Sequence, residues 1–223
     1  MEVLNLKKQG ITACVKNVVK ELRSGGVILY PTDTLYGLGA DALSDKAVGK
    51  IYELKGRDKR KPIHAIVADI KMMEKYAEVP DMARMLAKEF LPGPLTLILK
   101  KKKGVKTGVA KGISKIGFRV PNNPFCLALA KKFGKPITTT SANRAGCKTE
   151  CTVKEILEQL SGAEKKIGLV VDAGELPKRR LQVPPQPAGQ PSTVVDLTGT
   201  EPVILREGAI PVADIWNAVR TEE

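Results

Sequence analysis

Two short polar clusters, far apart in the chain, carry side chains that could bind a nucleotide. Lys55-Gly56-Arg57 offers an ammonium and a guanidinium, and Ser141-Ala142-Asn143 offers a hydroxyl and an amide. An ammonium binds phosphate as a point charge and a guanidinium binds it as a planar fork, while hydroxyl and amide groups suit a ribose or a phosphate oxygen. Both clusters follow expected regular elements, where scaffolds commonly present binding groups. Together they indicate a site that handles ATP.

A wider group of cations surrounds the first cluster. Six cationic side chains lie between residues 50 and 61: Lys50, Lys55, Arg57, Lys59, Arg60 and Lys61. A triphosphate would suit this density of positive charge. A solvated helix end would also explain it, because the helix dipole favours cations at the C-terminus. Spacing alone leaves both interpretations open, and the Ser-Ala-Asn cluster could likewise be an ordinary turn.

Two arginines accompany strand-like segments. Arg119 interrupts the apolar run 116–120, and an arginine there needs a carboxylate or a phosphate unless it reaches solvent. A buried structural ion pair is therefore the alternative to a ligand contact. Arg206 closes the last expected strand and raises the same question, with Glu207 as a local partner.

Several kinds of site are not supported. His64 is the single histidine and no Gly-x-Ser-x-Gly element is present, so hydrolase chemistry is not expected. Four cysteines, at positions 14, 126, 147 and 151, form no Cys-x-x-Cys pair and are expected to be buried or incidental thiols. The Rossmann and Walker A fingerprints are also absent, so a nucleotide would need another anion cradle.

Composition narrows the partners. The formal charge of +13 over 223 residues should attract nucleotides, pyrophosphate or RNA. Only 4% of residues are aromatic, which argues against a dedicated binder of single-stranded nucleic acid. No apolar run approaches the roughly 20 residues of a membrane span, and the first residues lack the apolar segment of a signal peptide. We expect a soluble, cytoplasmic protein without a membrane partner.

Alternating helical and strand patterns predict the fold. Helices are expected after the N-caps Thr12, Ser44, Asp81, Asn123 and Thr152, and at about 212–220. Strands are expected at 27–30, 63–67, 95–99, 116–120, 137–140, 169–172, 193–197 and 203–205, with a loop at 33–40. This alternation favours an α/β fold with a twisted mixed sheet flanked by helices. We expect one domain over 1–223, within which the proline-rich segment 174–191 forms a mobile loop or lid.

Read together, the motifs resemble the YrdC family, the single-domain threonylcarbamoyl-AMP synthases also called TsaC. The resemblance covers nearly the whole chain, and the order of its segments makes it specific. It rests on Pro31 to Gly39, Lys55-Gly56-Arg57, Pro92-Gly93-Pro94-Leu95-Thr96, Phe118-Arg119-Val120-Pro121, Thr140-Ser141-Ala142-Asn143, Pro191-Ser192-Thr193-Val194-Val195-Asp196 and Leu205-Arg206-Glu207-Gly208. In two places the chain departs from the family: Lys61-Pro62-Ile63 replaces a frequent Asn-Pro-Leu, and the segment 174–191 is longer and more basic than expected.

The resemblance implies a nucleotidyltransferase, L-threonylcarbamoyladenylate synthase. Such an enzyme forms threonylcarbamoyl-AMP and pyrophosphate from L-threonine, bicarbonate or CO2, and ATP. Mg2+ would accompany ATP without a direct protein ligand. The product would serve threonylcarbamoyladenosine modification beside the anticodon of tRNA, so a downstream threonylcarbamoyl transferase machinery is an expected partner. The implied fold has a basic concave face, and the chain would be a minimal enzyme that lacks the extra C-terminal domain of longer relatives.

The resemblance also implies roles for individual residues. Threonine contacts would fall on Thr32, His64, Arg119, Thr139 and Ser192. ATP contacts would fall on Lys55, Arg57, Ser141, Asn143 and Arg206, and by offset on Lys59, Lys115 and Thr149. Lys55 and Arg57 would be catalytic by holding the phosphates and the leaving pyrophosphate, while Arg119 would take a carboxylate. A carbamate is already an anionic nucleophile, so no general base is required.

Two rival functions remain open. The first is a non-catalytic protein of the same fold that binds double-stranded RNA or ribosomes, which the net charge would suit. The second is a related carbamoyl transfer, as in hydrogenase-maturation proteins. Those proteins carry zinc-finger and acylphosphatase segments, and this sequence shows neither.

Overall fold

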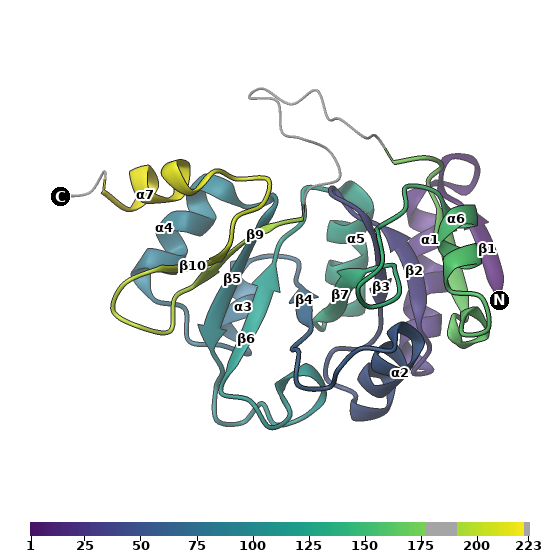
Figure 1. Ribbon diagram of the computed structural model, residues 1–223, viewed down its shortest axis with the longest axis horizontal. Coiled ribbons are helices and arrows are strands. Elements are labelled where there is room, and N and C mark those ends of the chain that lie inside the picture. Colours follow the sequence, from purple (N-terminus) through teal and green to yellow (C-terminus); the bar gives the residue numbers. More distant parts are fainter. Residues whose placement is uncertain (177–190, 221–223) are drawn as a thin grey trace.

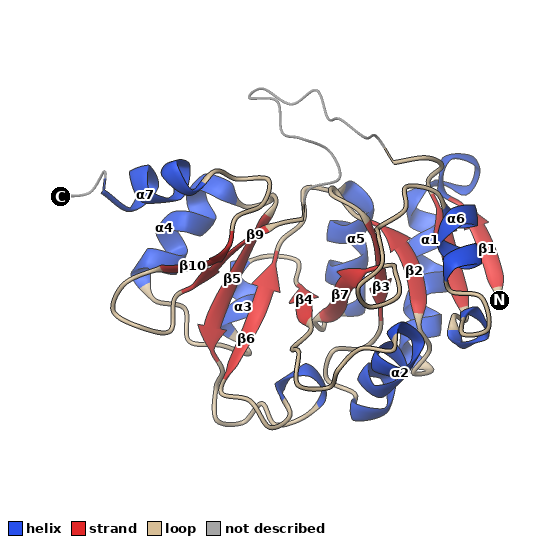
Figure 2. Cartoon of the chain, in the orientation of Figure 1, coloured by secondary structure: helices blue, strands red, loops and turns tan. Residues whose placement is uncertain are grey.

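A ten-stranded mixed sheet runs through the part of the chain that the computed structural model describes, residues 1–176 and 191–220 (Figures 1 and 2). The strands are β1 Glu2–Asn5, β2 Ile28–Pro31, β3 Tyr36–Gly39, β4 His64–Ile66, β5 Leu95–Lys100, β6 Lys115–Arg119, β7 Ile137–Ser141, β8 Leu169–Asp172, β9 Thr193–Asp196 and β10 Val203–Arg206. They are ordered β1-β8-β2-β3-β7-β4-β6-β5-β9-β10. The predicted α/β fold with a mixed sheet is confirmed, whereas the basic concave face stays a prediction.

Helices cover the sheet. They are α1 Leu6–Arg23, α2 Asp45–Lys55, α3 Ile70–Glu74, α4 Asp81–Phe90, α5 Pro124–Phe133, α6 Val153–Gln159 and α7 Val212–Arg220, with short 3-10 turns at Gly108–Ala110 and Glu164–Lys166. At one end α1 packs against α5, and at the other α4 packs against α7 (Figure 1). No helix in the described ranges is long and apolar enough to cross a membrane.

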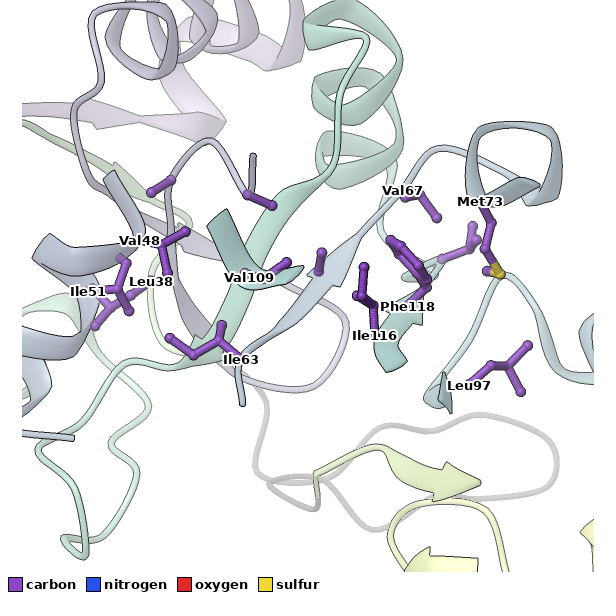
Figure 3. Packing of buried hydrophobic residues seen from close by; sticks show 14 of the residues in the cluster. Leu38, Val48, Ile51, Ile63, Val67, Met73, Leu97, Val109, Ile116 and Phe118 are labelled. Atoms are coloured by element: carbon purple, nitrogen blue, oxygen red, sulfur yellow. The ribbon is translucent and has the colours of Figure 1, made fainter. Parts of the chain in front are cut away.

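Apolar side chains on both faces explain the continuous apolar run of β2. Ile28 and Tyr30 belong to a cluster with α1 and α5, while Leu29 belongs to a larger cluster on the opposite face. Figure 3 shows this larger cluster extending from Ile51 of α2 to Phe118 of β6. A strand that is buried on both faces shows no alternation of apolar and polar residues, so it appears in the sequence as a short continuous apolar run.

Local capping chemistry sets several helix ends as predicted. Ser44 accepts a hydrogen bond from the Ala47 amide, and Asn123 accepts one from the Cys126 amide. Gly56 ends α2 at φ 58°, in the left-handed region that favours glycine. Lys55 therefore lies on the last turn of α2, and the chain turns sharply before Arg57.

Two predicted helix starts were wrong. The structure places the start of α1 at Leu6, capped by Asn5, so Thr12 lies inside the helix. Gly10 interrupts the helix at φ 77°, which hid the first turn from the apolar periodicity. Asp81 is the first residue of α4 and Pro80 is its N-cap. The short elements β1 and α3 were also not expected, because four or five residues show too little periodicity.

The predicted loop at 33–40 was wrong, because it contains β3, paired with β2 and β7. Glycines are depleted in strands, so Gly37 and Gly39 concealed it. Their presence has a steric reason, which is clearest at Gly39. A Cβ atom there would lie 2.8 Å from Cε1 of Tyr30 and 2.9 Å from Cγ1 of Ile28. Glycine thus allows β3 to pass beneath these side chains.

Two predictions on domain organisation stay predictions. A single domain over 1–223 is one of them. The other is the mobile loop at 174–191, of which residues 177–190 lie outside the described part of the chain.

Candidate functional site

A cavity of about 350 Å³ opens near the centre of the sheet, where β3, β7, β4 and β6 are neighbours (Figure 1). Its lining is rich in hydroxyl groups and includes three arginines. The lining residues are Thr32, Thr34, Leu35, Tyr36, Gly37, Arg57, Pro62, Ile63, His64, Thr96, Arg119, Thr139, Thr140, Ser141, Thr149, Pro191, Ser192 and Arg206. None of these described residues is an aspartate or a glutamate. Such a lining suits an anionic ligand.

The lining gathers most of the site residues that the sequence predicted. Those that line the cavity are Thr32, Arg57, His64, Arg119, Thr139, Ser141, Thr149, Ser192 and Arg206. Those outside the lining are Lys55, Lys59, Lys115 and Asn143. The ligand assigned to each residue stays a prediction.

Arg119 forms a buried ion pair at one end of the cavity. Its Nη2 lies 2.6 Å from Oδ1 of Asp33, and the two side chains are only 6% and 2% exposed. Nε donates to the Gly93 carbonyl and Nη1 donates to the Thr34 hydroxyl. A guanidinium carries five N–H donors, so Arg119 keeps donors for a ligand in the cavity. The structural ion pair and a ligand contact are therefore compatible.

Arg206 and Ser192 bring the last strands to the same cavity. Arg206 donates to the Ser192 carbonyl from Nε at 3.1 Å and from Nη2 at 2.7 Å. The predicted pairing of Arg206 with Glu207 was wrong. The Glu207 carboxylate instead accepts a hydrogen bond from the Val212 amide at the start of α7. Burial and the nearby Arg119 lower the pKa of Arg206. Two cations thus face one another in a lining that contains no carboxylate.

Thr96 is a lining residue that sequence reasoning missed. Its hydroxyl lies 2.7 Å from that of Ser192, and Thr96 is 1% exposed. The signal was present, because a polar residue stands between Leu95 and Leu97 in an otherwise apolar strand. Buried hydroxyls need hydrogen-bond partners, so this pair fixes the orientation of the Ser192 hydroxyl.

Tyr36 lies in the segment that was expected to be a loop, yet it is buried in β3 and lines the cavity. Its hydroxyl donates to the Gly174 carbonyl at 2.7 Å and accepts from the Ala173 amide at 2.9 Å. Burial raises the pKa of Tyr36 above its usual value, so the phenol remains protonated. It therefore fixes the backbone that follows β8.

His64 presents a neutral imidazole. Burial lowers its pKa to about 4, and the positive charges of Arg206 and Arg57 contribute to this shift. The ring lies over the backbone of Gly117, where a Cβ atom would be only 2.5 Å from the His64 Cδ2. Glycine at position 117 therefore makes room for the histidine ring on the neighbouring strand.

Lys55 lies behind the lining. Its ammonium donates to the carbonyls of Ser141 and Asn143 and to the Asn143 side-chain oxygen. The residue is 3% exposed, and burial, together with Arg57, lowers its pKa to about 7. Asn143 is buried beside it, whereas Ser141 and Thr149 reach the cavity.

The other cations of the 50–61 group do not gather at one site. Lys50 donates to the Gly25 carbonyl, Arg60 pairs with Asp58, and Lys59 is exposed outside the lining. Arg57 alone of this group lines the cavity. Its guanidinium is oriented by hydrogen bonds that it donates to the carbonyls of Lys61 and Pro62. The solvated helix end thus accounts for much of the cationic density.

Lys115 forms an ion pair with Asp196 outside the lining. The described residues include no group of three or more histidine, cysteine, aspartate or glutamate side chains that could hold a metal ion. The Asp33 carboxylate next to the cavity is taken up by Arg119 and by the Asn122 amide.

Comparisons with known proteins identify the family of the chain. A family model described as Sua5_yciO_yrdC, telomere recombination, matches residues 20–208. A Methanocaldococcus jannaschii protein, provisionally named threonylcarbamoyl-AMP synthase, is 37% identical over 95% of this chain and 94% of its own length. The threonylcarbamoyl-AMP synthase of Pyrococcus abyssi is also 37% identical, over 89% of this chain and 55% of its own length.

Solved structures give the same result. The crystal structure of Pyrococcus abyssi Sua5 complexed with L-threonine superposes with a TM-score of 0.85 at 33% identity, covering 99% of this chain. This chain spans 61% of that longer protein. The crystal structure of Escherichia coli YciO has a TM-score of 0.75 at 30% identity, with 95% of this chain and 96% of YciO covered. The resemblance seen in the sequence is thereby confirmed, and the chain belongs to the Sua5/YciO/YrdC family.

Proposed function

We propose that the chain is an L-threonylcarbamoyladenylate synthase, a nucleotidyltransferase that joins L-threonine, bicarbonate or CO2, and ATP into threonylcarbamoyl-AMP and pyrophosphate. The observation that carries the proposal is the cavity, which gathers three arginines and several hydroxyls without a carboxylate. The names of the relatives support the same reaction, and the threonine complex of one relative supports threonine as a ligand.

In this proposal the two substrates occupy different ends of the cavity. Threonine binds near Arg119, Ser192 and His64, where a guanidinium faces its carboxylate and a neutral imidazole faces its amino group. Thr32 and Thr139 complete that end. ATP binds near Arg57, Ser141 and Thr149, and Arg206 lies between the two. The junction of the substrates is then where the reacting atoms meet.

The chemistry needs positioning and charge neutralisation. The uncharged amino group of threonine first adds to CO2 and releases one proton to give the carbamate; bicarbonate yields this CO2 by taking up a proton and losing water. An oxygen of the threonine carbamate then attacks the α-phosphorus of ATP, a P–O bond forms, and the bond from the α-phosphorus to the pyrophosphate oxygen breaks. The electron pair leaves with pyrophosphate, and the carbamate has no proton to lose at this step. Arg57 and Arg206 offset the charge that develops on the phosphates. Mg2+ enters as part of the substrate MgATP and shares the charge of the leaving group.

The direct test is pyrophosphate release by the purified chain with MgATP, threonine and bicarbonate, each of the last two being omitted in turn. We expect release only when both are present. The variant Arg57→Met should lower the rate strongly, because it removes the cation that lines the nucleotide end. Pyrophosphate release that continues when either threonine or bicarbonate is omitted would refute the proposal.

A second candidate function is binding of double-stranded RNA without catalysis. It is favoured by the net charge of +13. A relative that is 33% identical is named only as the uncharacterized protein YciO, so family membership alone does not assign the activity. RNA binding without pyrophosphate release in the assay above would favour this candidate. The use of the product on tRNA, the transferase partners and a cytoplasmic location stay predictions.

A further inference from the structure

Lys55 is a buried cation whose partners are all uncharged. It is 3% exposed, and among the described residues no aspartate or glutamate forms an ion pair with it. Removing an ammonium from water is costly unless hydrogen bonds replace its hydration. The structure supplies such bonds from one short segment of the chain.

All three acceptors of the ammonium belong to the last residue of β7 and to the turn that follows it. They are the carbonyl of Ser141, the carbonyl of Asn143 at 2.7 Å and the side-chain oxygen of Asn143 at 2.9 Å. The backbone carbonyl of Lys55 also accepts from the Ala145 amide at 2.9 Å. Lys55 therefore holds this turn with both its side chain and its backbone.

Further hydrogen bonds connect this turn to residues that line the cavity. Asn143 Oδ1 accepts from the Ser141 hydroxyl at 2.6 Å, and Asn143 Nδ2 donates to the Cys147 carbonyl at 2.6 Å. Ser141 and Thr149, at the two ends of this segment, line the cavity. The position of both lining residues thus depends on a network built around one ammonium.

An ammonium has three donors, and the three oxygens of the turn use all of them. We propose that Lys55 is a positioning residue that holds the 141–149 segment against the nucleotide end of the cavity, while Arg57 supplies the charge that meets the phosphates. Only the identity of the nucleotide rests on the proposed function. The assignment changes the role that the resemblance implied for Lys55, from phosphate contact to support of the residues that make the contact.

The test compares two variants that each remove one cation. Lys55→Met keeps an unbranched side chain, and Arg57→Met removes the cation in the lining. Hydrogen exchange of the 141–149 amides is measured by mass spectrometry in the ligand-free protein, and ATP affinity is measured by calorimetry. We expect Lys55→Met to speed exchange of this segment about tenfold, as loss of one or two net hydrogen bonds would do. Arg57→Met should leave exchange unchanged, and both variants should weaken ATP binding.

Lys50→Met is the matched control on the same helix. The Lys50 ammonium donates to the Gly25 carbonyl, on a different loop, so its loss should leave exchange at 141–149 unchanged. If Lys55→Met weakens ATP binding while exchange at 141–149 stays at the wild-type level, Lys55 contacts the phosphates and the inference is overturned.

Lysine acetylation of the unaltered protein tests the same point without any variant. A buried, fully bonded ammonium should remain unlabelled with and without ATP, whereas the exposed Lys59 should be labelled in both conditions. Labelling of Lys55 in the free protein that ATP then suppresses would overturn the inference. Failure of the unaltered protein to bind ATP would instead refute the proposed function, and the exchange and acetylation results on the free protein would still stand.

Discussion

The cavity is supported at its two ends by buried cations that are held in opposite ways. Arg119 faces the carboxylate of Asp33, whereas Lys55 faces three uncharged oxygens of Ser141 and Asn143. For Arg119, Coulomb attraction to a carboxylate offsets the cost of removing the cation from water. For Lys55, only hydrogen bonds to uncharged oxygens offset that cost. One end is therefore a fixed ion pair, and the other depends on a proton that Lys55 loses at about pH 7.

The largest expected effect comes from breaking the fixed end. Asp33→Ala leaves the Arg119 guanidinium buried without a counter-charge, so we expect the free energy of unfolding to fall by about 3–5 kcal/mol. Urea denaturation measures this. Asp58→Ala is the control, because it breaks an ion pair with Arg60 that is exposed to solvent. Equal unfolding midpoints for the two variants would mean that the buried ion pair stabilises the fold no more than the exposed pair does.

The next effect is a pH dependence at the other end. Because burial lowers the pKa of Lys55 from 10.5 to about 7, the amine loses its proton as the pH rises through neutrality. A neutral amine has only two donors for three oxygens, so ATP affinity should fall several-fold on the alkaline side. Calorimetry of the wild type against Lys55→Met measures this, and the variant should show a flatter profile.

The stability of the fold should move in the opposite direction over the same window. Between pH 7 and 10.5 the unfolded chain keeps the Lys55 proton that the folded chain has released. The unfolded state then binds more protons, so this residue makes the free energy of unfolding rise with pH. A contribution that falls with pH, measured as the difference between wild type and Lys55→Met, would contradict the lowered pKa.

A smaller effect is expected from crowding the proposed threonine end without removing any charge. In Gly117→Ala the new Cβ would approach Cδ2 of His64 to 2.5 Å, so the ring must turn away from its place in the lining. We expect the KM for threonine to rise several-fold while the KM for ATP changes little. Gly104→Ala is a suitable control, because a Cβ there meets no atom within 4 Å. Equal shifts in both KM values would place His64 outside the threonine end.

The smallest effect concerns Lys115, which the sequence assigned to ATP by offset. Its side chain is half exposed and paired with Asp196 away from the lining, so Lys115→Ala should cost less than about 1 kcal/mol of stability. The KM for ATP should hardly change. A rise as large as that caused by Arg57→Met would restore the assignment made from the sequence.

Features with a local chemical cause could be predicted from the sequence. Ser44 and Gly56 mark the ends of α2 because a side-chain cap and a left-handed glycine act within one turn. β3 could not be predicted, because its glycines respond to Tyr30 and Ile28 on the neighbouring strand, a contact that only the fold creates.

The candidate site shows the same limit. The motifs identified Arg119 and Lys55 as special, yet their partners are distant in the sequence. Asp33 and Asn143 reach them only through the pairing of strands. Local sequence therefore reveals which residue types are unusual, and tertiary pairing decides whether they contact a ligand or support another residue.

The parallel pairing of β5 with β9 has a consequence for how the protein is made. Leu95 of β5 is in register with Thr193 of β9. One edge of β5 therefore has no partner strand until β9 has emerged from the ribosome. Ser192 and Arg206, which complete the cavity, arrive with that strand and the next one. A ligand that needs Ser192 and Arg206 can therefore stabilise only a chain whose synthesis has passed β10, and the earlier strands must remain associated without that ligand.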